Sequence, residues 1–471
     1  MRDSQHVFFF GLMAQGHLIP FLDMADVMCG RGVMVTRIST PLNGTILAKA
    51  LDHLRTDLGL EINIKVFKFP GLDSGVPENC ETVDFIASNS RGEANMFCDF
   101  LRASCILQRP FADEQLLDET KPNGVIADLF FPWATETAGK MSVPRLAFHG
   151  SSFFAMCAPA NLRCSSPRGT LPEEAESVVI AGLPHRIEVL RSQMPPADKS
   201  MGDLFGRIRE SELKSYGLLV NSFFELEPDY VRHYREIIGR RAWHIGPLSL
   251  RIDTGANDSS STLIRWLDSK SPGSVVYLCF GSMLDFNTAQ LREIALGLEA
   301  SGRPFVWVVK GAGNEWVPEG FLEEIKGAKG LIIKGWAPQV LILDHIGIGA
   351  FVTHCGWNSA MEGVCAGVPM VTWPMYAEQF YNEKLVTQVL KSGANVGSLQ
   401  WNRAMCHGAV KREVLCKALK RVMGSEEVED NRSRSRAKDF KEMAKRAVEE
   451  GGSSYSDYCT LMEDISSWLC N

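Results

Sequence analysis

The chain reads WAPQVLILDHIGIGAFVTHCGWNSAMEGVCAGVPMVTWPMYAEQ from Trp336 to Gln379, and this span carries the clearest fold pattern in the sequence. Within it, GAFVTH predicts a strand, CGWN predicts a tight turn, and the residues from Asn358 onward predict a helix. The N-terminus of such a helix presents free N–H groups and the positive end of the helix dipole. That arrangement suits a diphosphate, and His354 and Ser359 are placed to add side-chain donors.

Glu362 follows about one turn into the same helix, where a carboxylate can accept hydrogen bonds from both hydroxyls of a ribose. A simpler interpretation is also open, because Asn and Ser are common helix caps and Asn358 and Ser359 can serve as caps alone. The span therefore indicates either a nucleotide-binding strand, turn and helix or a merely capped helix.

The start of the chain has a similar strand, loop and helix pattern. An apolar run at Val7–Phe10 is followed by a loop to His17 and by helical spacing, with Pro20 expected in the first turn, where its missing N–H costs nothing. The pattern recurs at Ser274–Phe280, and short β-rich runs alternate with helical patterns in both halves. This alternation predicts an α/β fold with two doubly wound, Rossmann-like domains that face each other across a cleft.

The expected domain boundary is the stretch GPLSLRIDTGANDSSST at 246–262, which is rich in Gly, Pro, Ser, Asn and Asp. We therefore expect an N-terminal domain at 1–245, a linker at 246–262 and a C-terminal domain at 263–450. The last residues, 451–471, predict a helical segment that packs back on the N-terminal domain.

Composition excludes several classes of protein. The 471 residues carry a net charge of −7, which argues against a nucleic-acid surface. The 13 cysteines show no C-x-x-C pair and indicate reduced thiols. No apolar run approaches the ~20 residues that span a bilayer. We expect a cytoplasmic monomer without an integral membrane segment.

The span from Trp336 to Gln379 resembles the signature box of plant secondary-product UDP-dependent glycosyltransferases, which are inverting enzymes with the two-domain GT-B fold. The match runs from Trp-Ala-Pro-Gln through His-Cys-Gly-Trp-Asn-Ser to the closing Glu-Gln. MAQGHLIPFLDMA, STPLN, CFGS and GGSS also look like this family, so the resemblance covers nearly the whole chain. Ala360 and Met361 stand where the family more often has a hydroxyl residue and Leu.

The resemblance implies a donor site for a UDP-sugar, with glucose favoured because a closing Gln usually accompanies that sugar. It implies that Trp336 stacks on uracil and that Gln339 and Glu362 hold the ribose. The residues implied for the phosphates are Ser282, His354, Asn358 and Ser359, and those implied for the sugar hydroxyls are Trp357, Glu378 and Gln379.

His17, in the loop AQGHLIP, is the candidate general base for the hydroxyl of an acceptor. Such a base needs its second nitrogen held in one tautomer, and Asp128, in GVIADLFFPWA, is the candidate for that task. Taken alone, His17 can be a turn histidine and Asp128 the cap of a helix at Pro132. Together they match the family's catalytic His and Asp, which favours the catalytic role.

No Asp-x-Asp pair occurs, so we expect no metal and no other cofactor, with UDP-glucose as co-substrate. The resemblance implies a small lipophilic acceptor of the flavonoid, phenolic or terpenoid type. Its pocket is expected in the N-terminal half, with the candidates Met13, Phe130, Phe148 and Phe153. Two alternatives stay open: a nucleotide-sugar epimerase or hydrolase on the same fold, and a non-catalytic ligand-binding protein.

Overall fold

The computed structural model describes residues 5–45, 47–48, 62–69, 81–82, 122–165, 176–194, 199–251, 258–282, 286–310, 313–325, 329–401, 410–424 and 428–468. Every predicted site residue lies in these ranges. Residues 252–257 of the predicted linker and the last three residues of the chain lie outside them.

The first half of the chain forms a seven-stranded sheet in the order β3-β2-β1-β4-β5-β8-β9, with every neighbouring pair parallel. Its central strands are apolar on both faces, as in GVIAD and GLLV, because helices cover both sides. The strands are β1 (His6–Phe10), β2 (Met34–Ser39), β3 (Ile62–Val66), β4 (Gly124–Asp128), β5 (Arg145–His149), β8 (Gly217–Val220) and β9 (Ala242–His244).

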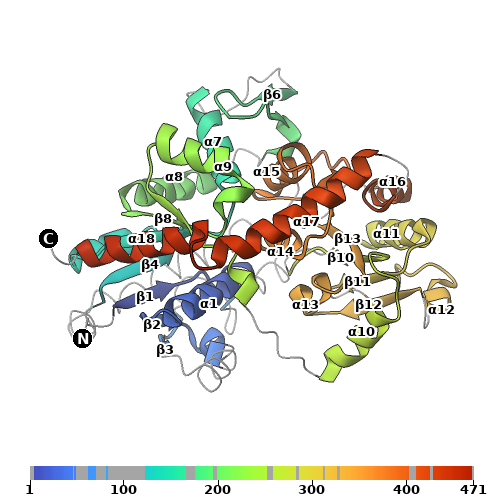
Figure 1. Cartoon of the computed structure of the whole chain (residues 1–471), viewed down its shortest axis with the longest axis horizontal. Helices are drawn as coiled ribbons and strands as arrows, with labels where there is room; N and C mark the ends of the chain where they lie inside the picture. Colours follow the sequence, from blue (N-terminus) through green and yellow to red (C-terminus); the bar gives the residue numbers. More distant parts are fainter. Residues whose placement is uncertain are drawn as a thin grey trace.

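The helices of this half connect the strands and cover the sheet (Figure 1). They are α1 (Gln15–Cys29), α6 (Ala134–Lys140), α7 (Phe153–Ser165), α8 (Lys199–Lys214) and α9 (Pro228–Arg232). A small antiparallel pair, β6 (Ser177–Val179) and β7 (Glu188–Leu190), lies apart from the main sheet.

The second half forms a six-stranded parallel sheet in the order β12-β11-β10-β13-β14-β15. Its strands are β10 (Val275–Cys279), β11 (Phe305–Val309), β12 (Gly330–Lys334), β13 (Ile348–Thr353), β14 (Met370–Thr372) and β15 (Gly393–Asn395). Its helices are α10 (Asp258–Asp268), α11 (Thr288–Ser301), α12 (Phe321–Ile325), α13 (Gln339–Leu343), α14 (Trp357–Ala366), α15 (Gln379–Lys384) and α16 (Arg412–Met423). The chain thus builds two parallel α/β sheets, as the alternation of strands and helices predicted.

The order of strands reverses at one point in each sheet. β1 lies between β2 and β4, and β10 lies between β11 and β13. In open parallel sheets, ligands bind beyond the carboxyl ends of the strands at this point. The loops that follow β1, β4, β10 and β13 are therefore the places where a site is expected.

Helix α1 begins earlier than the sequence predicted. It starts at Gln15, so Pro20 lies inside the helix rather than in its first turn. A proline at this depth removes one intrahelical hydrogen bond, because residue 20 has no N–H to donate to the carbonyl of Gly16. The expectation that Pro20 costs nothing is therefore wrong.

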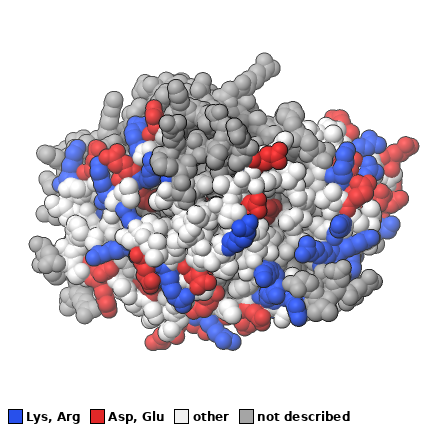
Figure 2. All heavy atoms as spheres, turned by 90° about the horizontal axis from the view of Figure 1, so that it is seen from above, with Lys and Arg blue, Asp and Glu red and all other residues white. Residues whose placement is uncertain are grey.

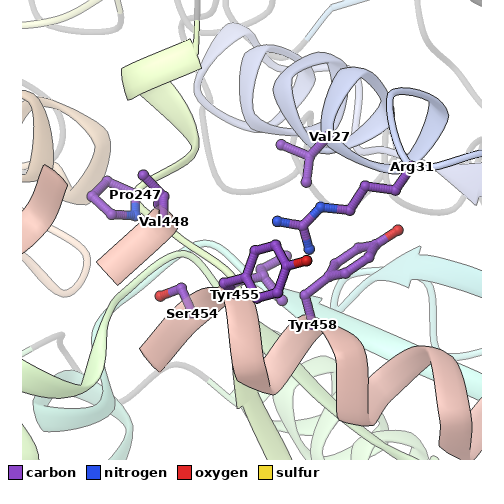
Figure 3. Close-up of a pocket in the computed structure, with 8 residues that line it drawn as sticks. Val27, Arg31, Pro247, Val448, Ser454, Tyr455 and Tyr458 are labelled. Atoms are coloured by element: carbon purple, nitrogen blue, oxygen red, sulfur yellow. The ribbon is translucent and has the colours of Figure 1, made fainter. Parts of the chain in front are cut away.

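The last two helices, α17 (Val428–Val448) and α18 (Ser453–Trp468), run across both halves (Figure 1). Helix α18 packs on the first half, where Tyr458 and Ile465 are buried in the same cluster as residues of β1. In the small pocket of Figure 3, the guanidinium of Arg31, in the turn after α1, stacks 4.5 Å and 4.1 Å from the rings of Tyr455 and Tyr458. The domain boundaries at 245, 262 and 450 stay a prediction.

The charged side chains on the face shown in Figure 2 are of mixed sign. Acidic and basic residues alternate around a broad region of uncharged atoms. In the part of the chain that the structure describes, no helix is both long and apolar enough to cross a bilayer.

Candidate active site

His17 and Asp128 meet where the order of the first sheet reverses. His17 lies in the first turn of α1, directly after the β1 loop, and Asp128 ends the neighbouring strand β4. The His17 Nδ1 lies 2.6 Å from the Asp128 Oδ2, and the pair joins positions 111 residues apart. Asp128 is fully buried, whereas 24% of the His17 side chain is exposed. The histidine therefore presents part of its ring to solvent while the carboxylate lies behind it.

The second oxygen of Asp128 is also bonded. Its Oδ1 accepts a hydrogen bond of 3.0 Å from the Phe130 N–H, and the Arg145 guanidinium donates to its backbone carbonyl at 3.2 Å. Because an ionised carboxylate only accepts, Nδ1 of His17 is the nitrogen that carries the proton. The lone pair of the imidazole is then on Nε2, which is the arrangement a general base needs.

Aromatic rings lie beside this pair. The Phe130 ring packs edge-on to His17, with centroids 5.7 Å apart and an interplanar angle of 67°. Phe205 of α8 packs against Phe130 at 6.4 Å and is 46% exposed. Sequence analysis missed Phe205, although an aromatic residue within a polar helix such as KSMGDLFGRIRE was a usable signal.

Three of the four acceptor candidates are core residues instead. Met13 is 3% exposed, and Phe148 and Phe153 are not exposed at all. Phe148 packs against Phe21 and Phe153 packs against Tyr234, so both rings are turned into the core. Their predicted place in the acceptor pocket finds no support in this packing, and Phe130 is the candidate that lies beside the base.

The loop after β13 leads directly into the N-terminus of α14. Cys355 takes a left-handed backbone conformation with a φ of 65°, and Gly356 is the N-cap residue. Gly356 itself makes no side-chain cap bond. Asn358 and Ser359 lie inside the helix and bond to Gly16 and Gln339, so the interpretation that they merely cap a helix is wrong. The Glu378 carboxylate accepts a hydrogen bond from the Trp357 N–H, the first of α14.

His354 directly follows β13, and Ser282 lies in the loop after the neighbouring strand β10. Gly281 has a φ of 77°, and a Cβ there would lie 2.8 Å from the His354 ring, so only glycine permits this approach. Burial lowers the pKa of His354 to about 4, which keeps the imidazole neutral at physiological pH. A neutral imidazole can donate one hydrogen bond to a phosphate oxygen without a charge of its own.

Gln339 organises the predicted ribose end of the site. Its amide nitrogen donates to the Ser359 Oγ at 2.9 Å and to the Glu362 Oε2 at 2.6 Å. Its amide oxygen accepts from the Tyr277 hydroxyl at 3.1 Å, a contact that sequence analysis missed. Burial raises the pKa of Glu362 to about 7, although the Gln339 bond opposes the shift. Trp336 lies at the surface, with 67% of it exposed, as a stacking platform would.

The predicted sugar-binding residues are tied to the backbone around them. The Gln379 Oε1 accepts from the N–H groups of Met375 and Tyr376 at 2.9 and 3.1 Å, so this end of the amide shapes the turn before α15. The Trp357 indole donates to the Asn221 carbonyl at 2.8 Å, so its N–H faces the first half of the chain. Burial raises the pKa of the Glu378 carboxyl group, and the nearby His17 opposes this effect.

Asn382 is a buried polar residue of the site region that sequence analysis missed. Its amide nitrogen donates to the Cys355 carbonyl at 2.9 Å and to the Glu378 Oε1 at 3.4 Å. Its oxygen accepts from the Ser152 hydroxyl of the first half at 3.4 Å. An amide side chain three positions after the signature box was the available signal.

No metal site is evident in the ranges that the structure describes, where no group of three or more His, Cys, Asp or Glu side chains converges. Among the described cysteines, Cys157, Cys355 and Cys365 are buried free thiols.

The chain is similar in sequence to known plant glycosyltransferases. The family model for UDP-glucoronosyl and UDP-glucosyl transferase matches residues 251–434. The scopoletin glucosyltransferase of Nicotiana tabacum is 50% identical over 98% of both chains. The anthocyanin 3'-O-beta-glucosyltransferase of Gentiana triflora is 48% identical over 100% of both chains.

A solved structure matches the whole fold. The crystal structure of a Glycyrrhiza uralensis UGT complexed with glycyrrhetinic acid 3-O-monoglucuronide has a TM-score of 0.89 and 36% sequence identity, and the match covers 99% of this chain and 97% of that one. Both sheets are included in that match, and the fold is GT-B. The chain therefore belongs to the plant secondary-product UDP-dependent glycosyltransferases.

Proposed function

We propose that this enzyme transfers glucose from UDP-glucose to a hydroxyl group of a small phenolic acceptor, with inversion at the anomeric carbon. The observation that carries the proposal is the 2.6 Å bond between His17 and Asp128, placed next to the N-terminus of α14. The Asn358 amide, in the first turn of α14, lies 2.6 Å from the carbonyl of Gly16, the residue before His17. A base and an anion-binding helix thus meet within one site.

In this proposal His17 acts on the acceptor. Its Nε2 accepts the hydroxyl proton while the acceptor oxygen bonds to the anomeric carbon of glucose and the bond from that carbon to the diphosphate breaks. Asp128 stabilises the imidazolium that forms, because its buried carboxylate already holds Nδ1. Direct attack from the side opposite UDP converts an α-linked donor into a β-glucoside.

The donor is held by the second half of the chain. Trp336 stacks on uracil, Glu362 and Gln339 hold the ribose, and the phosphates meet the N-terminus of α14. His354, Asn358, Ser359 and Ser282 add donors there, while Glu378, Gln379 and Trp357 contact the sugar. The exposed Trp336 and the Gln339–Glu362 bond of 2.6 Å support the nucleoside end of this assignment.

A flat aromatic acceptor fits the rings beside His17. Phe130 touches the imidazole, and the half-exposed Phe205 extends the same aromatic surface. A phenol stacked on these rings presents its hydroxyl to the base. The names of the two plant relatives, which mention scopoletin and anthocyanin, support the phenolic class.

We further propose that catalysis needs no metal and that the enzyme is a cytoplasmic monomer. Size-exclusion chromatography with light scattering tests the oligomeric state, and fractionation of a tagged enzyme in plant cells tests its location.

The deciding experiment is a mass-spectrometric screen of a hydroxylated panel that contains coumarins, flavonoids and terpenoid alcohols. Each acceptor is incubated with UDP-glucose, UDP-galactose or UDP-glucuronic acid. We expect glucosides of phenols, with the β configuration shown by the anomeric proton coupling in NMR. Donor breakdown without a conjugate indicates a hydrolase, a donor epimer indicates an epimerase, and binding without turnover indicates a ligand-binding protein.

A further inference from the structure

The first turn of α1, which carries His17, is closed by backbone hydrogen bonds from the His17 and Leu18 N–H groups to the Ala14 carbonyl, at 2.9 and 2.8 Å. Its N-cap residue, Ala14, makes no side-chain cap bond, and its second residue, Gly16, is the least restricted residue type. A Cβ at Gly16 would meet no atom within 4 Å, so side-chain packing does not fix this position either. The Asp128 bond orients the imidazole ring but does not hold this backbone.

Pro20 removes one hydrogen bond from the turn that follows. In an α-helix the carbonyl of residue 16 accepts from the N–H of residue 20, and proline has none. The proline ring also crowds the carbonyl four residues before it, which turns that carbonyl outward. The carbonyl of Gly16 is thus left to find a donor outside α1.

Asn358 supplies that donor from the other half of the chain. Its Nδ2 lies 2.6 Å from the Gly16 oxygen, and the two residues are 342 positions apart. A carbonyl can only accept, so the amide nitrogen, and not the amide oxygen, must face it. The NH₂ group has a second N–H, and Asn358 sits in the first turn of α14, where the diphosphate is proposed to bind.

We propose that Asn358 is a positioning residue that connects the base to the donor. One N–H holds the Gly16 carbonyl and the second N–H binds the diphosphate, so the bound donor fixes the His17 backbone relative to the anomeric carbon. The inference rests on the proposed function, because it needs His17 as the base and a diphosphate at α14.

Asparagine suits this task better than its common replacements. Aspartate has no N–H and would place an oxygen against the Gly16 oxygen, and serine has one donor where two are needed. The halves do not depend on this bond alone, because the Trp357 indole donates to the Asn221 carbonyl at 2.8 Å. Removing the Asn358 amide should therefore leave the packing of the two halves against each other intact.

A double-mutant cycle on kcat tests the coupling, with Asn358→Ala, His17→Ala and the double variant. We expect Asn358→Ala to lower kcat by about tenfold or more in the natural enzyme and by at least fivefold less in the His17→Ala background. Ser359→Ala is the matched control: it removes a neighbouring donor-side hydroxyl, so its effect should be the same in both backgrounds. An equal effect of Asn358→Ala in both backgrounds overturns the inference and leaves the proposed function standing.

Pro20→Ala gives a second, opposite test. It restores an N–H that can bond the Gly16 carbonyl within α1 and so competes with Asn358. We expect a several-fold lower kcat, an unchanged Kd for UDP and a thermal midpoint that is equal or higher. An unchanged kcat in a stable Pro20→Ala enzyme contradicts the inference. Near-normal turnover of His17→Ala alone overturns the proposed base and the inference with it.

Discussion

The donor side and the acceptor side of this enzyme are built in different ways. Most of the proposed donor residues lie in one span of 44 residues, around one strand, one turn and the helix that follows. The base and its carboxylate are 111 residues apart and meet only because β1 and β4 are neighbours in the sheet. Phe205, beside them, comes from a third segment, α8.

This difference decides how each side can vary. A diphosphate is bound by backbone N–H groups at a helix end, so local sequence that makes the turn also makes the site. An acceptor pocket is lined by side chains from separate segments, and each can change without disturbing the donor turn. The donor side therefore identifies the chemistry, while the acceptor side sets which molecule is modified.

The strongest test of this separation is to remove the base alone. We expect His17→Ala to lower kcat by at least about a hundredfold while the Kd for UDP stays within about twofold, because the imidazole contacts the acceptor and not the nucleotide. Initial rates by chromatography and UDP titration calorimetry measure the two quantities.

Asp128→Ala serves as the companion variant. Asp128→Ala should lower kcat by less than His17→Ala does, since the imidazole can still act in a mixture of tautomers. An equal or greater loss with a lowered thermal midpoint would instead assign the buried carboxylate to folding. Near-normal turnover of His17→Ala would contradict the assignment of the base to the acceptor side, because catalysis would then depend on the donor residues alone.

Gln379 tests whether the donor side also chooses the sugar. Glucose and galactose differ at one hydroxyl, and a mismatched buried polar group costs roughly 1–3 kcal/mol. We expect kcat/KM to favour UDP-glucose over UDP-galactose by about tenfold or more, and Gln379→His to narrow this ratio mainly by losing glucose activity. Rates with both donors, on a variant of verified thermal stability, measure the ratio.

The structure supplies a control for that experiment. The Gln379 Oε1 holds the N–H groups of Met375 and Tyr376, so Gln379→His also removes a structural contact. Gln379→Glu keeps an acceptor for those N–H groups but loses the amide donors. We expect Gln379→Glu to retain stability and lose preference for glucose. A natural enzyme that prefers galactose, or a ratio that neither variant changes, refutes the role in sugar choice.

Glu362 gives UDP-glucose binding on the donor side a dependence on pH. Burial raises the pKa of its carboxyl group to about 7, and the ionised form is the one that accepts from two ribose hydroxyls. The carboxylate is therefore lost as pH falls through 7, and UDP-glucose binding should weaken by about tenfold from pH 8 to pH 6. Titration of UDP-glucose at several pH values measures this change.

Glu362→Gln is the matched variant, because glutamine keeps the size of the side chain and does not titrate. It should bind UDP-glucose more weakly at pH 8 and show little change between pH 8 and pH 6. A pH dependence that survives in Glu362→Gln would belong to another group, such as Asp23. Burial, and then the neighbouring Glu362, raise the pKa of Asp23 to about 8.

The parts of this structure that sequence could predict follow the same division. The parallel sheets followed from apolar runs that alternate with helical spacing, and the α14 turn followed from CGWN after GAFVTH. Three of the acceptor candidates chosen near strand ends are buried in the structure. Phe148 and Phe153 are buried in the core, where Phe148 packs against Phe21 of α1 and Phe153 against Tyr234.

Contacts between the halves were out of reach of sequence for a physical reason. Asn358 and Gly16, or Asn382 and Ser152, are brought together by the placement of whole domains, which no local pattern encodes. The position of Pro20 within α1 was also not predictable from sequence. Its effect depended on where α1 begins, and helix ends are poorly specified by sequence.

The smallest expected effect concerns metal ions. The diphosphate that leaves the sugar carries negative charge, and in the proposed site that charge meets the N-terminus of α14, the neutral His354 and the Ser359 hydroxyl. These are fixed dipoles, which need no reorganisation as the charge develops. We therefore expect EDTA to change the initial rate by no more than about twofold, measured on enzyme dialysed against the chelator.

The control adds Mg²⁺ or Mn²⁺ to the dialysed enzyme and should also leave the rate nearly unchanged. Loss of activity that either ion restores would mean that the helix end alone does not suffice. The donor side would then depend, as the acceptor side does, on groups that its local sequence does not reveal.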